Sequence, residues 1–239
     1  MKQINTMLKN KKQAFSIIEI AVVLAVIGIL LSSVIIGKNL VDKAKIANAQ
    51  TLTINSVVHS LDKNLIFWHE TSFGQESYRN NIWFDYQQDK SKKNNASNAT
   101  ATTTDKPTLL EDSENLISNI SALHFTSGQF LTQPALQNIN NSHFTIFVVH
   151  SNANNANDNN IFSNFTNDPT QTIVDANKRL LVWQCCASSF VSSFGNASTI
   201  GGSYVGDMYE IIVFNTQLTD FSRDEIIAYL KAKYKFKAN

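Results

Sequence analysis

Glu19 is the residue of this sequence that most needs a chemical explanation, because its carboxylate stands in a long apolar segment. From Ile17 to Ile36 every other residue is apolar or small, and the segment is about as long as a helix that crosses ~30 Å of hydrocarbon at ~1.5 Å per residue. A carboxylate costs about 2.5–3.5 kcal/mol at the centre of a bilayer and less near its surface. The segment is therefore either an uncleaved anchor with an interfacial glutamate or a helix that uses the charge.

The other acidic residues and the histidines do not form a catalytic pattern. Retaining glycosidases need two carboxylates about 5–5.5 Å apart, and the E-x-D-x-x-E pattern that supplies them on a strand is missing. Glu111, Asp112 and Glu114 form a run typical of a solvated loop, and Glu210 on its apolar strand is interpreted as a structural carboxylate. The histidines are scattered along the chain: His59, His69, His124, His143 and His150. We expect no enzymatic activity.

Metal ligands and cofactor motifs are not evident either. The CxxC, HExxH and EF-hand spacings do not occur, so we expect neither a metal nor a cofactor. A calcium site at the rim of the domain stays open as an alternative, with hard oxygen ligands from Asp158, Asp168, Asp175 and Asp207. The neighbouring Cys185 and Cys186 are interpreted as small strand residues, because a disulfide between adjacent residues is strained.

Three tryptophans, Trp68, Trp83 and Trp183, are the candidates for binding a glycan. Their rings can stack on the face of a sugar, with hydrogen bonds from the asparagine-rich loops. Against this, a tryptophan in a β-sandwich is more often part of the core. Both interpretations stay open at this point.

Charges on the two sides of the apolar segment predict its orientation. Lys2, Lys9, Lys11 and Lys12 precede it, so the positive-inside rule places the N-terminus in the cytoplasm and sends the rest of the chain across the membrane. Without these four lysines and Glu19, 16 basic and 18 acidic residues remain, a net charge near −2. We therefore expect no nucleic-acid binding.

Periodicity predicts a long helix followed by strands. Apolar residues recur at helical spacing as far as Leu65, so we expect one continuous helix from Ser16 to about Leu65. A polar stretch, 87–105, is predicted to be a surface loop. Strands are expected at 82–86, 144–150, 161–163, 179–183 and 209–214, and the segments 123–126 and 129–131 are expected to form a hairpin. The strand 144–150 is mostly apolar and should be central.

A final helix is predicted at 223–234, with an apolar face and lysines in its last turns. Ser222 and Glu225 have the spacing of a capping box at its start.

The N-terminal segment resembles that of type IV prepilins and type II secretion pseudopilins. The similarity rests on the basic leader, Ala14, Phe15, Glu19 four positions later, and the apolar run. It implies cleavage between Ala14 and Phe15 by a prepilin peptidase/methyltransferase, which then methylates Phe15. It also implies assembly with other pilin or pseudopilin subunits, in which the carboxylate of Glu19 pairs with a neighbouring subunit's N-terminal ammonium. That family usually has Gly before the cut, where this chain has Ala14.

A second resemblance concerns the rest of the chain. The segment 206–215, then 218–220 and the final helix, is similar to the end of laminin-G-like, concanavalin A-like jelly-roll domains. The similarity implies a β-sandwich but no specific function, because that fold carries lectins, glycosidases and interaction modules alike.

Together these observations predict an α+β chain: a leader at 1–14, a pilin-type helix at 15–67 that spans the membrane at about 17–36, and a jelly-roll head at 68–239. The expected function is a structural subunit of a type IV pilus or secretion-type filament, whose head serves interaction or adhesion. The alternative is a membrane-anchored, lectin-like protein that does not assemble. The expected partners are the processing enzyme, other subunits, inner-membrane lipid and, for the alternative, a glycan.

Overall fold

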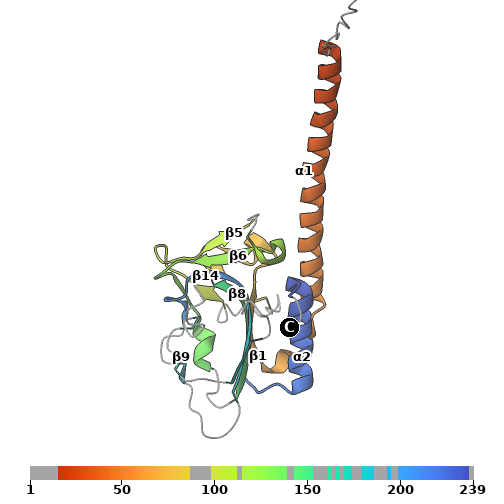
Figure 1. Cartoon of the computed structure of the whole chain (residues 1–239). Coiled ribbons are helices and arrows are strands. Elements are labelled where there is room, and N and C mark those ends of the chain that lie inside the picture. The colour runs from red at the N-terminus through yellow and green to blue at the C-terminus, as the bar shows by residue number, and fades with distance from the viewer. Residues whose placement is uncertain are drawn as a thin grey trace, which may run out of the picture. The chain divides into compact units, whose positions relative to one another are not determined.

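The computed structural model of the chain describes residues 16–86, 98–111, 115–138, 143–152, 161–162, 165–166, 170–173, 179–185, 193–194 and 199–236. The chain divides into two compact units, Met1–Lys43 and Ala44–Asn239. A long apolar helix, antiparallel sheets and a final helix follow one another along the chain (Figure 1), in the predicted order.

The long helix α1 covers Ile17–Ile54 and is shorter than predicted. Just after its last residue, Asn55 donates two hydrogen bonds to the carbonyl oxygen of Thr51, one from its backbone N–H at 3.1 Å and one from its side-chain amide at 2.9 Å. The next residues, Val57 and Val58, are β-branched and disfavour an α-helix. The chain therefore continues as a 3-10 helix, η1 (Val57–Asn64), and Leu65 already begins strand β1 (Leu65–Glu70).

A seven-stranded antiparallel sheet forms the larger layer of the head. Its order is β10-β11-β8-β14-β6-β5, and β1 pairs with β14 on the edge that β6 also uses. The further bounds are β5 Thr108–Leu110, β6 Ala122–Phe125, β8 Phe144–Asn152, β10 Thr170–Ile173, β11 Leu180–Cys185 and β14 Gly206–Phe214. The predicted strand at 144–150 is thus confirmed, and β8 is central, between β11 and β14.

A five-stranded sheet, β13-β7-β4-β3-β2, forms the second layer. Its strands are β2 Tyr78–Arg79, β3 Ile82–Trp83, β4 Ala99–Thr100, β7 Phe130–Thr132 and β13 Thr199–Gly201, and β9 (Phe165–Thr166) pairs separately with β12 (Ser193–Phe194). Asn80 and Asn81 join β2 to β3 with φ of 53° and 62°, as a two-residue hairpin turn with two left-handed residues requires. Strand β4 lies within the stretch that the sequence predicted to be loop, so that prediction is wrong for Ala99–Thr100.

The hairpin predicted around Ser127 and Gly128 is also wrong. Strand β6 belongs to the seven-stranded sheet and β7 to the five-stranded one, although the turn is tight, with Gln129 N–H donating to the carbonyl of Thr126 at 3.0 Å. Both segments have strand-like sequences, and the chain crosses here from one layer to the other because each segment buries apolar side chains in the space between the sheets.

Two apolar cores hold these layers together. The first lies between the sheets and combines residues such as Ile146 and Val148 of β8 with Trp83 of β3 and Leu131 of β7. The second lies on the outer face of the seven-stranded sheet, where α2 packs (Figure 1), and it also includes Ala49 of α1 and Val58 of η1.

The C-terminal helix α2 covers Asp220–Tyr234 and begins three residues earlier than predicted. Its N-cap is Thr219, whose hydroxyl accepts from the backbone N–H of Ser222 at 3.2 Å. The capping box predicted at Ser222 and Glu225 is therefore wrong, because Ser222 already lies in the first turn. Short 3-10 turns complete the described elements: η2 Gly74–Glu76, η4 Ile117–Asn119 and η5 Pro134–Asn138.

Candidate functional site

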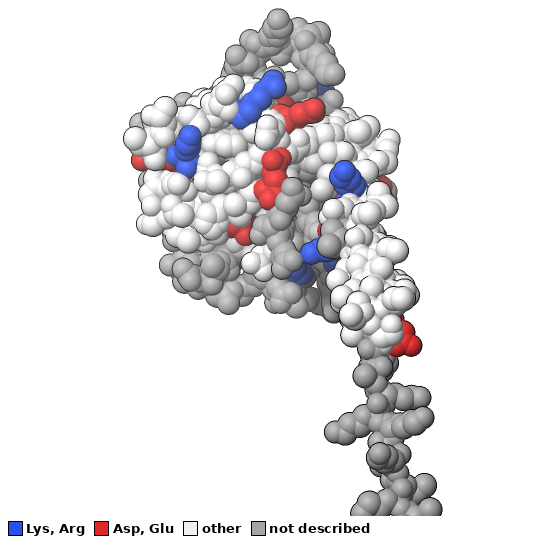
Figure 2. Space-filling model, turned by 90° about the horizontal axis from the view of Figure 1, so that it is seen from above, with Lys and Arg blue, Asp and Glu red and all other residues white. Residues whose placement is uncertain are grey.

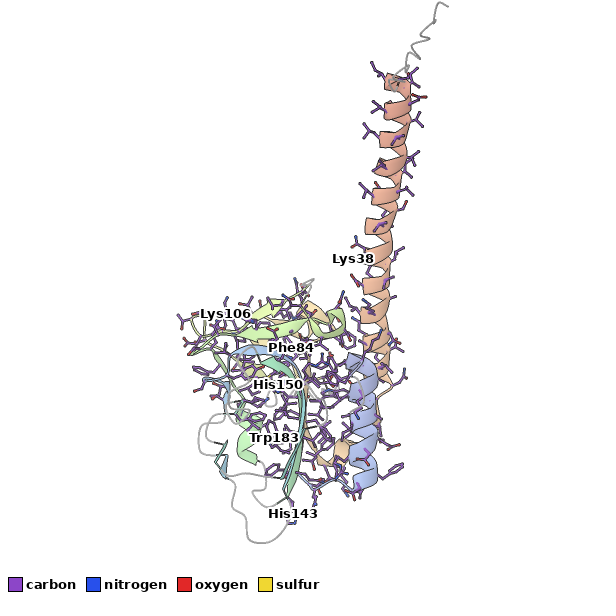
Figure 3. All side chains as sticks on the ribbon, viewed as in Figure 1. Lys38, Phe84, Lys106, His143, His150 and Trp183 are labelled. Carbon is purple, nitrogen blue, oxygen red and sulfur yellow. The ribbon has the colours of Figure 1, made fainter. Side chains whose placement is uncertain are left out.

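The N-terminal half of α1 presents apolar side chains in all directions (Figure 3). Ile17 is 86% exposed, and the apolar side chains that follow, as far as Ile36, are exposed wherever they are described. The hydroxyls of Ser32 and Ser33 donate to the carbonyls of Gly28 and Ile29, both at 2.8 Å, so they need no outside partner. Within the described residues this is the one helix long and apolar enough to cross a membrane. Such a surface is suited to lipid or to other apolar helices.

Glu19 lies in the first turn of α1, where its Oε2 accepts the backbone N–H of Ser16 at 2.8 Å. The side chain is exposed on the otherwise apolar segment. A carboxylate is favoured beside the N–H groups at the start of a helix, and its exposure leaves room for an approaching cation. The predicted cleavage and methylation residues, Ala14 and Phe15, lie outside the described residues.

The three candidate tryptophans are buried, with exposed fractions of 0% for Trp68, 0% for Trp83 and 1% for Trp183 (labelled in Figure 3). Trp68 Nε1–H donates to Glu210 Oε1 at 2.7 Å, and Trp83 Nε1–H donates to the carbonyl of Glu70 at 3.0 Å. Trp83 and Trp183 belong to the core between the sheets and Trp68 to the core on the outer face, so their ring faces are removed from solvent. The glycan-stacking interpretation of these three residues is therefore corrected: they are core residues.

The head instead contains a buried ion cluster, in which Lys233 of α2 reaches two carboxylates. Lys233 Nζ lies 2.8 Å from Glu210 Oε2 on β14 and 3.1 Å from Glu70 Oε2 on β1. All three side chains are at most 1% exposed. Burying charges is costly unless they are paired and their remaining hydrogen-bonding capacity is filled.

The carboxylate of Glu210 is fully hydrogen-bonded. Its Oε1 accepts from Trp68 Nε1 and from the hydroxyl of Tyr229 at 2.9 Å, and its Oε2 accepts from Lys233 and from the hydroxyl of Tyr234 at 2.9 Å. Burial, and then the charge of Glu210, raises the pKa of both tyrosines well above the usual value, so they remain neutral donors. Four donors, one from β1 and three from α2, therefore hold the carboxylate of Glu210 inside the head.

Glu70 is held as tightly by its own neighbours. Its Oε2 accepts from the backbone N–H of Ser72 at 2.8 Å, and also from the Ser72 hydroxyl, while its Oε1 accepts from the hydroxyl of Ser77 at 3.1 Å. With Lys233, both oxygens are engaged. Both carboxylates of the cluster are therefore engaged by donors of the head itself.

His69, next in sequence to Glu70, lies in the apolar layer and is fully buried. Its ring stacks on Trp83 at 5.0 Å, and its Nδ1 lies 3.0 Å from the carbonyl of Phe84 (labelled in Figure 3). Burial lowers the pKa of the imidazole to about 4, partly offset by that carbonyl. His69 is therefore a neutral core residue at neutral pH.

The remaining candidates do not converge on a site within the described residues. His124 Nδ1 pairs with Asp207 Oδ1 at 2.7 Å on the outer face of the sheet, Glu111 is exposed, and His143 is exposed. Asp112, Glu114, Asp158, Asp168, Asp175 and Cys186 lie outside the described residues, and β11 ends at Cys185. Among the residues that are placed, no three His, Cys, Asp or Glu side chains gather to hold a metal ion.

The described residues on one face of the molecule show no basic stripe either. On the face that Figure 2 shows, the described Lys and Arg side chains are few and separate, with acidic ones between them. The absence of a gathered positive surface on this face gives no support to phosphate-backbone binding.

Sequence reasoning missed the buried cluster. The sequence analysis interpreted the lysines in the last turns of the final helix through the helix dipole, and it did not single out Glu70. One feature of the sequence could have indicated the cluster: at helical spacing, Lys233 lies on the same face of α2 as the apolar residues Tyr229, Leu230 and Tyr234.

Comparison with known proteins gives a result for the N-terminal segment alone. No curated protein and no solved structure shows a significant match to the chain. Residues 9–35 match the family model described as the prokaryotic N-terminal methylation motif. This range covers Ala14, Phe15, Glu19 and most of the apolar run. The match supports a type IV pilin-like prepilin segment and, at that level, a membrane-anchored pilin- or pseudopilin-like subunit.

Proposed function

We propose that the protein is a structural subunit of a type IV pilus or of a type II secretion-type filament. In this proposal the chain is cut between Ala14 and Phe15 by a prepilin peptidase, Phe15 is methylated, and the helix that follows first lies in the inner membrane and then in the filament. The leader stays in the cytoplasm and the head lies on the other side of the membrane. The observation that carries the proposal is Glu19, exposed in the first turn of an apolar helix within the matched motif.

The physical reason is the cost of an unpartnered charge. In lipid or in a bundle of apolar helices, the carboxylate of Glu19 has only the Ser16 N–H among its described contacts. An N-terminal ammonium from a neighbouring subunit supplies the missing positive charge, and the pair then offsets much of the cost of removing both from water. Apolar side chains around the helix bury one another in the same step.

The head is proposed to be a jelly-roll of the concanavalin A-like kind that acts as an interaction module without catalysis. Two antiparallel sheets around a shared core support the sandwich. The full engagement of Glu70 and Glu210 in hydrogen bonds supports the absence of hydrolytic carboxylates. A role in adhesion, on or at the tip of a filament, is part of this proposal, and the resemblance is compatible with it because that fold carries interaction modules among other functions.

Mass spectrometry of the N-terminus tests the processing step. Protein purified from membranes should begin at a methylated Phe15. A protein that still begins at Met1, or that is cut after Ser32 or Ser33 as by ordinary signal peptidase, would contradict the proposal.

Substitution of Glu19 tests assembly. Glu19→Ala should leave membrane insertion intact, because it removes a charge from the apolar segment, yet the protein should no longer be recovered in sheared filaments. Glu76→Ala is the matched control, since Glu76 is an exposed acid of the head, and it should assemble normally. Normal incorporation of Glu19→Ala would favour the anchored protein that does not depend on this charge.

A further inference from the structure

The buried ion cluster begins with two carboxylates that face each other directly. Glu70 and Glu210 are register partners in the antiparallel pair of β1 and β14. Like charges in this position repel, and the repulsion is stronger away from water. Lys233 lies within hydrogen-bond distance of both. The pairing of β1 with β14 at this point therefore depends on a cation that α2 brings.

Two short bridges connect the same carboxylates to the last turns of α1. The hydroxyl of Tyr229, which donates to Glu210, lies 3.3 Å from Thr53 Oγ1. On the other side, Gln50 Nε2 donates to the carbonyl of Ser72 at 3.0 Å, and Ser72 is the residue that donates to Glu70. Thr53 is fully buried in this contact. A single residue thus connects each carboxylate to α1: Tyr229 for Glu210 and Ser72 for Glu70.

We propose that this cluster, which we name the joint cluster and define as Glu70, Ser72, Glu210, Tyr229 and Lys233, makes the docking of α1 residues 44–54 onto the head conditional on α2. When α2 is absent or undocked, the two facing carboxylates lose their cation, β1 is destabilised against β14, and the Tyr229 bridge to Thr53 is lost. When α2 docks, charge balance, strand pairing and helix docking form together.

This dependence gives the head a built-in order of assembly. The helix α1 is synthesised first and α2 last among the described elements, and a domain generally folds as a unit. The end of α1 therefore becomes fixed to the head only after the whole sheet and α2 are in place. The inference does not rest on the filament proposal, because it concerns contacts inside the unit Ala44–Asn239.

Hydrogen exchange measured by mass spectrometry on the full chain in detergent micelles tests the proposal. Tyr229→Phe removes the bridging hydroxyl and keeps the ring. Exchange should rise about tenfold in peptides that cover 44–54 and stay unchanged in β8 and β11. Tyr204→Phe is the matched control: its hydroxyl is also buried and donates to the carbonyl of Asp207 at 2.9 Å, but it lies outside the joint cluster.

Lys233→Met tests the dependence on charge, with Lys231→Met on the same helix as its control. We expect faster exchange at 44–54 and 65–70, at least about tenfold beyond any change in β8. Adding Glu70→Gln and Glu210→Gln to Lys233→Met should restore part of the protection, because the facing charges are then gone. Unchanged exchange at 44–54 in Tyr229→Phe, or an equal rise for Tyr204→Phe and Tyr229→Phe at that segment, would overturn the proposal.

Discussion

Glutamate occurs in two apolar surroundings in this protein, and the two regions treat it differently. In the head, Glu70 and Glu210 are sealed from water and receive Lys233, two tyrosine hydroxyls, serine donors and a tryptophan N–H from the same chain. On the N-terminal half of α1, Glu19 is exposed, and the described residues give it a backbone N–H. The head completes its charges internally.

The difference shows what each region can do by itself. The two apolar cores of the head and its buried ion cluster are completed by residues of the same unit. The apolar segment leaves its side chains exposed and its carboxylate reachable, so an environment of lipid or other helices must complete it. Within our proposal that completion is assembly, and it can be attacked separately from the stability of the head.

The largest expected effect comes from removing a glutamate in each region in turn. Glu210→Ala should lower the free energy of unfolding of the head by about 3–5 kcal/mol, because it removes one of the two carboxylates that bind the buried Lys233 and leaves the donors of Trp68, Tyr229 and Tyr234 without this acceptor. Glu19→Ala should leave that free energy unchanged. Denaturant unfolding in micelles, followed by tryptophan fluorescence, measures both. Equal losses of unfolding free energy from the two substitutions would contradict the conclusion that Glu210 stabilises the head and Glu19 does not.

The dependence of stability on pH tests whether the buried environment of His69 in the head disfavours its protonation. His69 has a folded-state pKa of about 4, against an ordinary value of 6.5, so below pH 6.5 the unfolded chain binds a proton that the folded chain refuses. The contribution of His69 to the free energy of unfolding is therefore complete above pH 6.5. It declines as the pH falls toward 4, by about 3 kcal/mol in all.

Unfolding free energies measured between pH 7 and pH 4 should show this decline, and His69→Gln should flatten it. His124→Gln is the control, because His124 pairs with Asp207 in a contact that is only partly buried. A slope that survives His69→Gln unchanged would assign the decline to other groups.

A smaller effect is expected from the tryptophan that bonds to Glu210. Trp68→Phe keeps an aromatic ring but removes the Nε1–H donor at 2.7 Å. A hydrogen bond to a charged group contributes about 1.5–3 kcal/mol, and we expect a loss in that range plus a contribution from the smaller ring. Calorimetry should record a lower Tm with the fold retained. A loss below that range would mean that the remaining donors satisfy Glu210.

The smallest effect is expected at the N-cap of α2, far from any buried charge. Thr219→Ala removes the hydroxyl that accepts from Ser222 N–H and should cost about 1 kcal/mol. Ser222→Ala, which keeps the backbone donor, should cost less. Denaturant midpoints of the two variants give the comparison, and an equal cost would show that the cap hydroxyl is not the stabilising group.

Local patterns in the sequence were enough for part of this description. The apolar run 17–36, the leader lysines and the spacing of Phe15 and Glu19 predicted a membrane helix of prepilin type, and the match at residues 9–35 supports that segment. The apolar strand 144–150 predicted the centre of the sheet. These features are readable because the length of an apolar run and the period of its residues are properties of the chain itself.

Tertiary structure decided the rest. The predicted helical segment, 15–67, overlapped the start of β1 at 65–67. These residues form a strand because β1 pairs with β14, which is far away in sequence. The tight turn between the segments of β6 and β7 is compatible with a hairpin and with a crossing between sheets. The strands lie in separate sheets because both bury apolar side chains in the core between the layers. The same long-range contacts bury the three tryptophans and bring Lys233 to Glu70 and Glu210. No local sequence pattern predicts the contact of Lys233 with these two carboxylates, because the energy of a buried charge depends on partners that only the folded chain supplies.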